Sequence, residues 1–153
     1  MPIYMKIEGI DGPITHDGTK GWIEIQSLSW GSSSGREPQV PTISEMVVTK
    51  DQDVASSTLF KQALWGEGKK VTIVFVKGGD SPQEYLRITL ENALISSYST
   101  SGSGGGYRPA EFFTLNFTKI TFEKGSSAHA SLMIRSQDWG SMQAMKEFNR
   151  AKA

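Results

Sequence analysis

The chain has 153 residues, a length typical of a single domain, and its 16 lysines and arginines balance 16 aspartates and glutamates. We therefore expect no partner held mainly by charge, neither nucleic acid nor an anionic membrane. The absence of cysteine excludes disulfides and thiolate metal sites, and two histidines are too few for a histidine-rich metal site. The longest strongly apolar run, residues 71–76, is too short for membrane insertion.

Alternation of apolar and polar residues with a period of two, typical of half-buried strands, dominates the chain. It predicts a first strand over residues 3–7 and a second over residues 22–30. Within the second strand the apolar positions switch from odd to even numbers, which predicts a β-bulge near Gln26 or Ser27.

A polar loop is predicted over residues 31–41 and a strand over residues 43–50. Apolar residues then recur at helical spacing, which predicts a helix that buries one stripe. The predicted stripe consists of Leu59, Phe60, Ala63 and Leu64. We expect Ser56 to cap the start of this helix, and Gly66 and Gly68 to end it.

The second half of the chain continues with strands. A hairpin is predicted from residues 70–77 and 85–97, followed by strands over residues 113–117 and 128–136. Residues 138–152 change to a three-residue spacing of apolar side chains, with basic residues toward the end, which predicts a short helix.

These elements together predict a mainly β protein, a two-sheet β-barrel or sandwich with one flanking α-helix and a short C-terminal helix. We divide the chain into a β-barrel domain, residues 1–137, and a C-terminal helical extension, residues 138–153.

One motif matches a catalytic pattern. Residues 31–35 read G-x-S-x-G, the pattern of a nucleophile elbow, with Ser33 as the nucleophile. That mechanism needs a helix directly after the serine, whereas Pro38 and Pro41 follow here, and His129, the histidine that comes after it, falls in a predicted strand. We therefore interpret the segment as a loop and predict no enzyme activity and no catalytic, cofactor-binding or metal-binding residues.

Five segments, taken in their order along the chain, resemble a known protein family. They are IEGIDG at 7–12, WIEIQSLSWG at 22–31, ASSTLF at 55–60, ENALISSYSTSGSGG at 91–105 and FTLNF at 113–117. In this order they resemble the hemolysin-coregulated protein (Hcp) family, the tube proteins of bacterial type VI secretion systems. The resemblance covers about residues 3 to 136, and residues 138–153 depart from the family pattern.

The resemblance implies a barrel of two sheets that assembles into homohexameric rings, which stack into a tube. It also implies that small effectors are carried in the ring lumen. Ser29 matches a position that faces this lumen, so it is the candidate cargo contact. Ser32, Ser34, Arg36 and Glu37 belong to the loop that the family uses for contacts between subunits or rings.

The implied partners are copies of the chain, a spike protein, a contractile sheath and effector proteins. The implied location is the bacterial cytoplasm, followed by export to the medium or a target cell without a cleavable signal peptide. Two alternatives stay open: a monomeric β-barrel that binds a ligand on a face bearing Trp22 and Trp30, and a serine hydrolase centred on Ser33. The mass in solution tests the first alternative, because a ring of six is far heavier than a monomer. Ester hydrolysis that persists in a Ser33→Ala variant would exclude Ser33 as the nucleophile.

Overall fold

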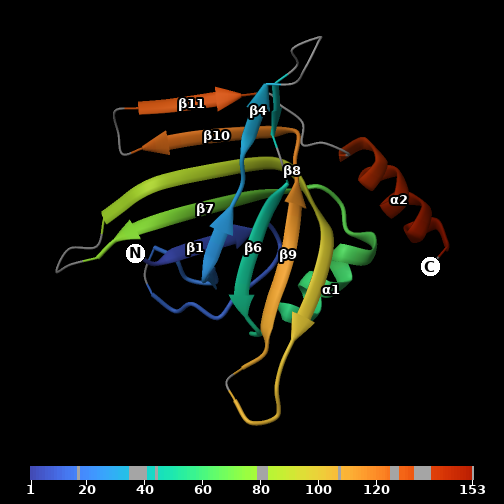
Figure 1. The fold of residues 1–153 in the computed structure, drawn as a ribbon, viewed down its shortest axis with the longest axis horizontal. Helices are drawn as coiled ribbons and strands as arrows, with labels where there is room; N and C mark the ends of the chain where they lie inside the picture. The colour runs from blue at the N-terminus through green and yellow to red at the C-terminus, as the bar shows by residue number, and fades with distance from the viewer. Residues whose placement is uncertain are drawn as a thin grey trace.

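A computed structural model describes residues 1–16, 18–34, 41–43, 45–78, 83–106, 108–124, 128–132 and 139–152 (Figure 1). The strands are β1 (Ile3–Ile7), β2 (Ile23–Ile25), β3 (Ser27–Ser29), β4 (Ser32–Ser34), β5 (Pro41–Ile43), β6 (Met46–Asp51), β7 (Lys69–Lys77), β8 (Gln83–Ser101), β9 (Ala110–Asn116), β10 (Lys119–Lys124) and β11 (Ala128–Leu132). The helices are α1 (Ser56–Trp65) and α2 (Trp139–Lys152).

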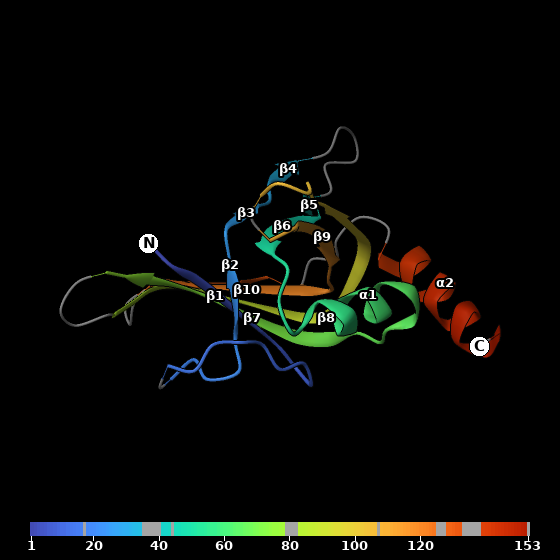
Figure 2. The same cartoon turned by 90° about the horizontal axis from the view of Figure 1, so that it is seen from below.

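Two antiparallel layers make up the body of the molecule (Figure 2). Sheet I contains β2, β1, β7, the first half of β8, β10 and β11, and sheet II contains the second half of β8, β9, β6 and β3. The long strand β8 belongs to both layers, and α1 lies beside them (Figure 1). The structure therefore confirms a mainly β fold of two sheets with a flanking helix and a terminal helix.

Strand β8 passes from sheet I to sheet II at Asn92. This residue has a φ of 53°, the left-handed conformation that asparagine tolerates better than most residues, and its side-chain amide donates to Thr118 Oγ1 at 3.0 Å. Gly68 packs directly against the bend, since a Cβ atom there would lie 3.1 Å from Asn92 Cα. The corner thus depends on close backbone contact at Gly68.

The second corner lies between β2 and β3, where Gln26 separates the two strands. β2 pairs with β1 in sheet I, β3 pairs with β6 in sheet II, and the Gln26 N–H donates to the Thr49 carbonyl at 2.8 Å. In place of the predicted β-bulge within one strand, the structure has a junction between two strands, and the change of parity marks the residue at which the chain changes layer.

The core lies between the sheets and under α1. Its largest fully buried apolar side chains come from both sheets and from the helix: Met5, Ile23, Met46, Leu59, Ile73, Ile88, Leu90, Phe113, Leu115 and Phe117. In β1, β8 and β9 they occupy alternate positions, so the period-two pattern correctly predicted which side of these three strands is buried.

Helix α1 begins differently from the prediction. Ala55 holds the N-cap position and Ser56 is the first helical residue. The Ser56 hydroxyl donates to the buried Glu111 carboxylate, while Asp53 Oδ1 accepts from the Ala55 N–H at 2.8 Å. The capping role assigned to Ser56 is therefore wrong.

The predicted apolar stripe of α1 is only half correct. Leu59 is fully buried and Ala63 is half-buried against the core, whereas Phe60 and Leu64 are exposed, Phe60 by 53%. Gly66 is the C-cap, as predicted. The spacing of apolar residues in this short helix did not show which of them face the core and which form an adjoining exposed strip.

Helix α2 packs against α1 and supplies the charges that α1 lacks at its C-terminal end. Lys146 Nζ donates to the carbonyls of Gln62 and Ala63 at 3.2 and 2.7 Å, and Arg150 donates to those of Trp65 and Gly66 at 3.1 and 3.0 Å. Cations are favourable at this end of a helix dipole, so α2 completes α1 from outside. The division into domains at residues 137 and 138 stays a prediction.

Within the described part of the chain, neither helix is long and apolar enough to cross a membrane.

Candidate functional site

The outward face of sheet II carries two parallel rows of uncharged side chains. Directly paired residues of neighbouring strands lie on the same side of a sheet, so the register defines the rows. The first row is Ser29, Val47, Thr114 and Ser97, and the second is Ser27, Thr49, Phe112 and Ser99. We call these eight residues the hydroxyl face.

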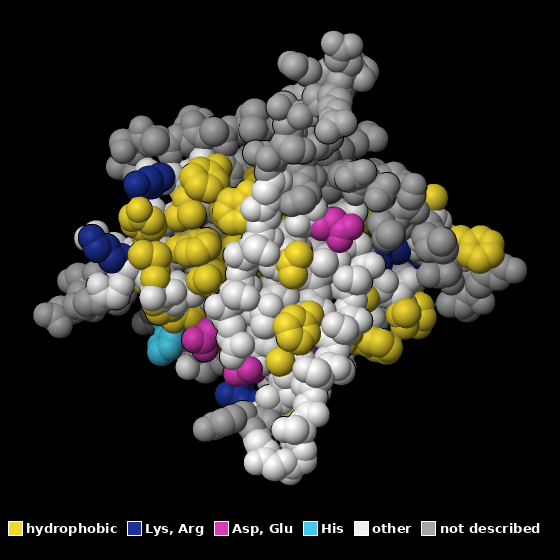
Figure 3. Space-filling view, viewed as in Figure 1, with side chains coloured by type: hydrophobic (Ala, Val, Ile, Leu, Met, Phe, Trp, Pro, Cys, Tyr) yellow, Lys and Arg dark blue, Asp and Glu magenta, His cyan; other side chains and the backbone are white. Residues whose placement is uncertain are grey.

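The hydroxyl face is accessible, and most of its side chains are serine or threonine. Val47 and Phe112 are its apolar members, and each is 40% exposed. In the space-filling view, the centre of the molecule over β6 and β9 is mostly white, with isolated yellow groups (Figure 3). The face therefore offers hydroxyl donors and acceptors around two apolar side chains.

Hydrogen bonds between strands hold part of this face in place. Thr114 Oγ1 lies 2.7 Å from Ser97 Oγ and also shares a hydrogen bond with Ser96, the extra residue at a bulge in β8. Ser96 Oγ further donates to Glu45 Oε2 at 3.2 Å, which places a carboxylate at the margin of the face. Two hydroxyl groups of the face, those of Thr114 and Ser97, are thus held by hydrogen bonds between strands.

Beneath sheet II, at the end that α1 covers, lies a fully buried ion pair. Lys50 Nζ lies 2.6 Å from Glu111 Oε1 and 3.1 Å from Asp53 Oδ2. Burial by itself would raise the pKa of Glu111, but hydrogen bonds from Lys50, Ser56 and Tyr98 outweigh it and lower that pKa. Glu111 is therefore a carboxylate that ties β9 to β6, to β8 and to the first turn of α1.

A separate apolar area lies on sheet I, at the end that sheet II leaves uncovered. Ile3, Phe75 and Leu86 are cross-strand neighbours there and are half-buried, while Phe122 is exposed and lies 6.3 Å from the Trp30 ring. Figure 3 shows this area as the gathering of yellow on the left. We call it the sheet I patch, and define it by Ile3, Phe75, Leu86 and Phe122.

The residues predicted from the sequence as contacts lie in two places. Ser29 ends β3, is exposed and belongs to the hydroxyl face. Ser32 and Ser34 lie in β4, opposite Ile43 and Pro41 of β5, and Ser33 lies between them opposite Thr42. Arg36 and Glu37 lie outside the described residues. Their roles in binding stay predictions.

Ser29 is the one member of the hydroxyl face that the sequence analysis named, and its two apolar members, Val47 and Phe112, were not predicted. Val47 precedes a buried valine and Phe112 precedes a buried phenylalanine, so residue type alone does not separate the outward side chains from the inward ones. Their position in the alternation could have identified them as outward-facing, because each lies between two buried residues. The face becomes visible only when the register places Val47 opposite Ser29.

The two tryptophans proposed for a common ligand face do not share one. Trp30 packs against the core and near Phe122, whereas Trp22 lines a pocket on the outward side of sheet I.

Solved structures share the two-layer sheet with its flanking helix. Hcp1 from Salmonella typhimurium is 28% identical with a TM-score of 0.72, covering 85% of this chain and 90% of that one. A type VI secretion system effector from Yersinia pestis is 27% identical with a TM-score of 0.72, covering 85% and 96%. Hcp1 from E. coli EAEC 042 has a TM-score of 0.76 at 20% identity, and it supports the fold alone.

The sequence comparisons agree with this fold. The family described as "Type VI secretion system effector, Hcp" matches residues 4–123, most of the chain. Protein hcp1 of Pseudomonas aeruginosa is 54% identical over 43 residues, which is 28% of this chain and about a quarter, 26%, of that protein. The chain belongs to the Hcp family of type VI secretion tube proteins.

Proposed function

We propose that the chain is the ring-forming subunit of a type VI secretion tube, and that the hydroxyl face lines the lumen of a homohexameric ring and holds small effectors during export. The uncharged character of the eight residues of this face is the observation that carries the proposal. A lining of hydroxyl groups and two exposed apolar side chains accepts many polypeptide surfaces and repels none by charge. Such binding is weak enough to allow release.

The ring contact is the second part of the proposal. A ring requires that one surface of a subunit meet a different surface of its neighbour. The sheet I patch is one apolar surface, and Val54, Phe60 and Leu64, exposed at and before α1, form another. The sheet I patch lies on the left of Figure 3, and α1 lies on the right of Figure 1 in the same orientation, so two distinct surfaces are available. The balanced net charge keeps repulsion between copies small.

Contacts between stacked rings are assigned to Ser32 and Ser34 of β4 and to Arg36 and Glu37, which follow that strand in the sequence. The spike protein, the sheath and the effectors are the remaining proposed partners, and export from the bacterial cytoplasm by the type VI secretion system is the proposed route. No enzymatic role is proposed. Deletion of residues 36–39 is expected to weaken stacking while the rings persist, as seen by electron microscopy.

Electron microscopy of the purified chain tests the ring itself. We expect particles with sixfold symmetry, and we expect Phe122→Lys to reduce them because a charge would be placed in the apolar contact. Thr121→Lys, on the opposite side of the same strand, is the matched control and should leave the rings intact. A monodisperse monomer at high concentration would contradict the ring and favour the monomeric binding module.

A further inference from the structure

A pocket of about 470 Å³ lies on the outward side of sheet I, on the other side of the molecule from the hydroxyl face. Its lining residues are Tyr4, His16, Gly18, Thr19, Trp22, Val74, Val76, Glu84 and Arg87. The volume and the mixture of aromatic, aliphatic and few charged groups are typical of binding pockets in proteins. Neither the hydroxyl face nor the sheet I patch includes these residues.

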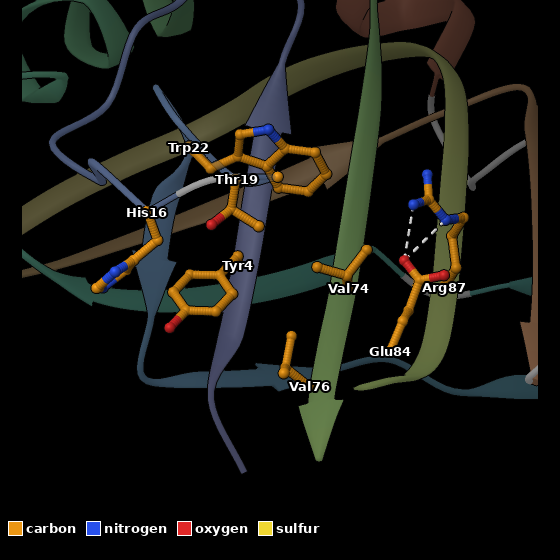
Figure 4. Close-up of a pocket in the computed structure, with 9 residues that line it drawn as sticks. Tyr4, His16, Thr19, Trp22, Val74, Val76, Glu84 and Arg87 are labelled. Atoms are coloured by element: carbon orange, nitrogen blue, oxygen red, sulfur yellow. Dashed lines mark hydrogen bonds and ion pairs between the residues drawn. The ribbon is translucent and has the colours of Figure 1, made fainter. Parts of the chain in front are cut away.

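The pocket has an aromatic side and a charged side (Figure 4). Tyr4 and Trp22 stand on one side, Val74 and Val76 of β7 lie between, and Glu84 and Arg87 of β8 form the far side. Arg87 Nη2 and Nε lie 2.7 and 3.0 Å from the same oxygen, Glu84 Oε1. The second carboxylate oxygen, Oε2, is an acceptor for an incoming donor.

The aromatic side is held in place before any ligand arrives. The loop that carries Trp22 is tied by backbone hydrogen bonds from the Gly12 N–H to the Gly21 carbonyl at 2.7 Å and from the Gly21 N–H to the Ile14 carbonyl at 2.8 Å. Gly12 must be glycine, since a Cβ atom there would lie 2.4 Å from the Trp22 carbonyl oxygen. A rigid wall reduces the entropy lost when a ligand binds.

The charges around the pocket favour a cation. One transverse row across sheet I reads Glu24, Tyr4, Val74, Arg87 and Glu123, and Glu84 adds a further carboxylate at the pocket. Glu84 and Arg87 are the carboxylate and the guanidinium in the lining and are paired with each other, while Glu24 and Glu123 of the same row add two carboxylates beside the pocket and Lys20 adds an amine next to Thr19.

The nearest lysine on β1 does not reverse this balance. Lys6 Nζ donates to the Ile10 carbonyl at 3.0 Å and lies 3.4 Å from Asp11 Oδ1, so it is engaged by the neighbouring turn.

We propose that this pocket receives a lysine or arginine side chain of a partner protein. The aliphatic stem would lie over Val74 and Val76, the aromatic rings of Tyr4 and Trp22 would contact the cationic end region, and Glu84 would accept its hydrogen bond. Aromatic rings attract cations through their negative faces, and a carboxylate strengthens that preference. The pocket lies on the opposite side of the molecule from the hydroxyl face, so the proposal does not require that face to enclose a lumen.

Peptide titration followed by NMR of the full chain tests the proposal, with the Trp22 indole N–H and the Arg87 Nε–H as reporters. The probes are acetyl-Gly-Lys-Gly-amide, its arginine counterpart, and the analogues with norleucine and glutamate at the central position. We expect the lysine and arginine peptides to shift both reporters, and to bind about fivefold or more tightly than the norleucine peptide. Equal binding of norleucine, tighter binding of glutamate, or no shift with any peptide would overturn the proposal.

Variants then locate the interaction. Trp22→Leu and Glu84→Gln are each expected to weaken lysine peptide binding by about fivefold. Tyr4→Leu is a second aromatic variant that keeps the test valid if Trp22→Leu does not fold. Glu91→Gln is the matched control, because Glu91 lies on the same strand outside the pocket and pairs with Lys119 at 3.9 Å. Unchanged binding in both Trp22→Leu and Glu84→Gln would contradict the site.

Discussion

Ser29 and Val47 lie directly opposite each other on β3 and β6, and both side chains are exposed on the outward face of sheet II. Thr114 lies opposite Val47 on the next strand, so one line across three strands carries a hydroxyl, an apolar side chain and a second hydroxyl. This alternation makes the face neutral and moderately apolar. The proposed lumen lining depends on this relationship more than on Ser29 alone.

A charge on the hydroxyl face should abolish effector retention without breaking the rings. Phe112→Glu places a carboxylate at the centre of a neutral surface, and a sixfold ring would carry six of them. We expect effectors to be lost from the purified ring, and we expect Ser29→Gln to reduce them partially by bulk. Co-purification followed by mass spectrometry measures both, with Glu24→Gln on sheet I as the control. Undiminished co-purification with Phe112→Glu would refute the lining.

The buried pair of Lys50 and Glu111 should be essential for stability. Lys50→Met leaves the Glu111 carboxylate buried without its cation, which is expected to lower the free energy of unfolding by about 3 kcal/mol. Lys119→Met removes an exposed partner of Glu91 and should change stability by about 0.5 kcal/mol or less. Urea denaturation of both variants checks the contrast, and equal losses would mean that burial of the pair is not what matters.

The docking of α2 on α1 through Lys146 should contribute to stability in a way that depends on pH. Burial, and to a smaller extent Arg150, lowers the pKa of Lys146 to about 8 from an ordinary 10.5. Between about pH 8 and 10.5, Lys146 therefore binds fewer protons in the folded protein than in the unfolded chain. The contribution of Lys146 to stability is thus lowest below about pH 8 and rises as the pH increases to about 10.5. Thermal unfolding of the wild type minus that of Lys146→Met should show this rise, and a flat difference would contradict it.

The corner at Asn92 should be sensitive to a single methyl group at Gly68. Gly68→Ala places a Cβ atom 3.1 Å from Asn92 Cα and 3.3 Å from its carbonyl carbon, so backbone must move. We expect a loss of about 1–2 kcal/mol in the free energy of unfolding. Gly104→Ala, where nothing lies within 4 Å, is the control and should be close to neutral. If both variants behave alike in urea, Gly68 is not a packing constraint.

The strands were largely predictable from the sequence because each buries one side. Alternation located β1, β7, β8 and β9, and the parity switch located the corner at Gln26. Strand β10 was missed, although Ile120 and Phe122 alternate with Thr121 and Glu123. Only Ile120 is fully inside, since Phe122 belongs to the uncovered patch, so the burial signal in β10 is short.

Long-range partners account for what the sequence could not predict. Serine is a favoured N-cap residue, yet the Ser56 hydroxyl donates to Glu111, which is 55 residues away in the sequence. Lys146 and Arg150 are of the residue types that favour the C-terminal end of their own helix, and the structure shows them donating to the carbonyls of α1. A local sequence pattern can show that a side chain suits a helix end, but it does not show which group that side chain will bind. The partner is set by the packing of elements that are distant in the sequence.

The most direct test of the account is site-specific labelling, which the natural absence of cysteine makes simple. Single variants Ser29→Cys, on the hydroxyl face, and Glu24→Cys, on the outward side of sheet I, would each be treated with a small maleimide and with a bulky polyethylene glycol maleimide. We predict that both cysteines react with the small reagent, but that in assembled rings Ser29→Cys is protected from the bulky one while Glu24→Cys is not. Equal modification of the two by the bulky reagent in intact rings would contradict the placement of the hydroxyl face in the lumen.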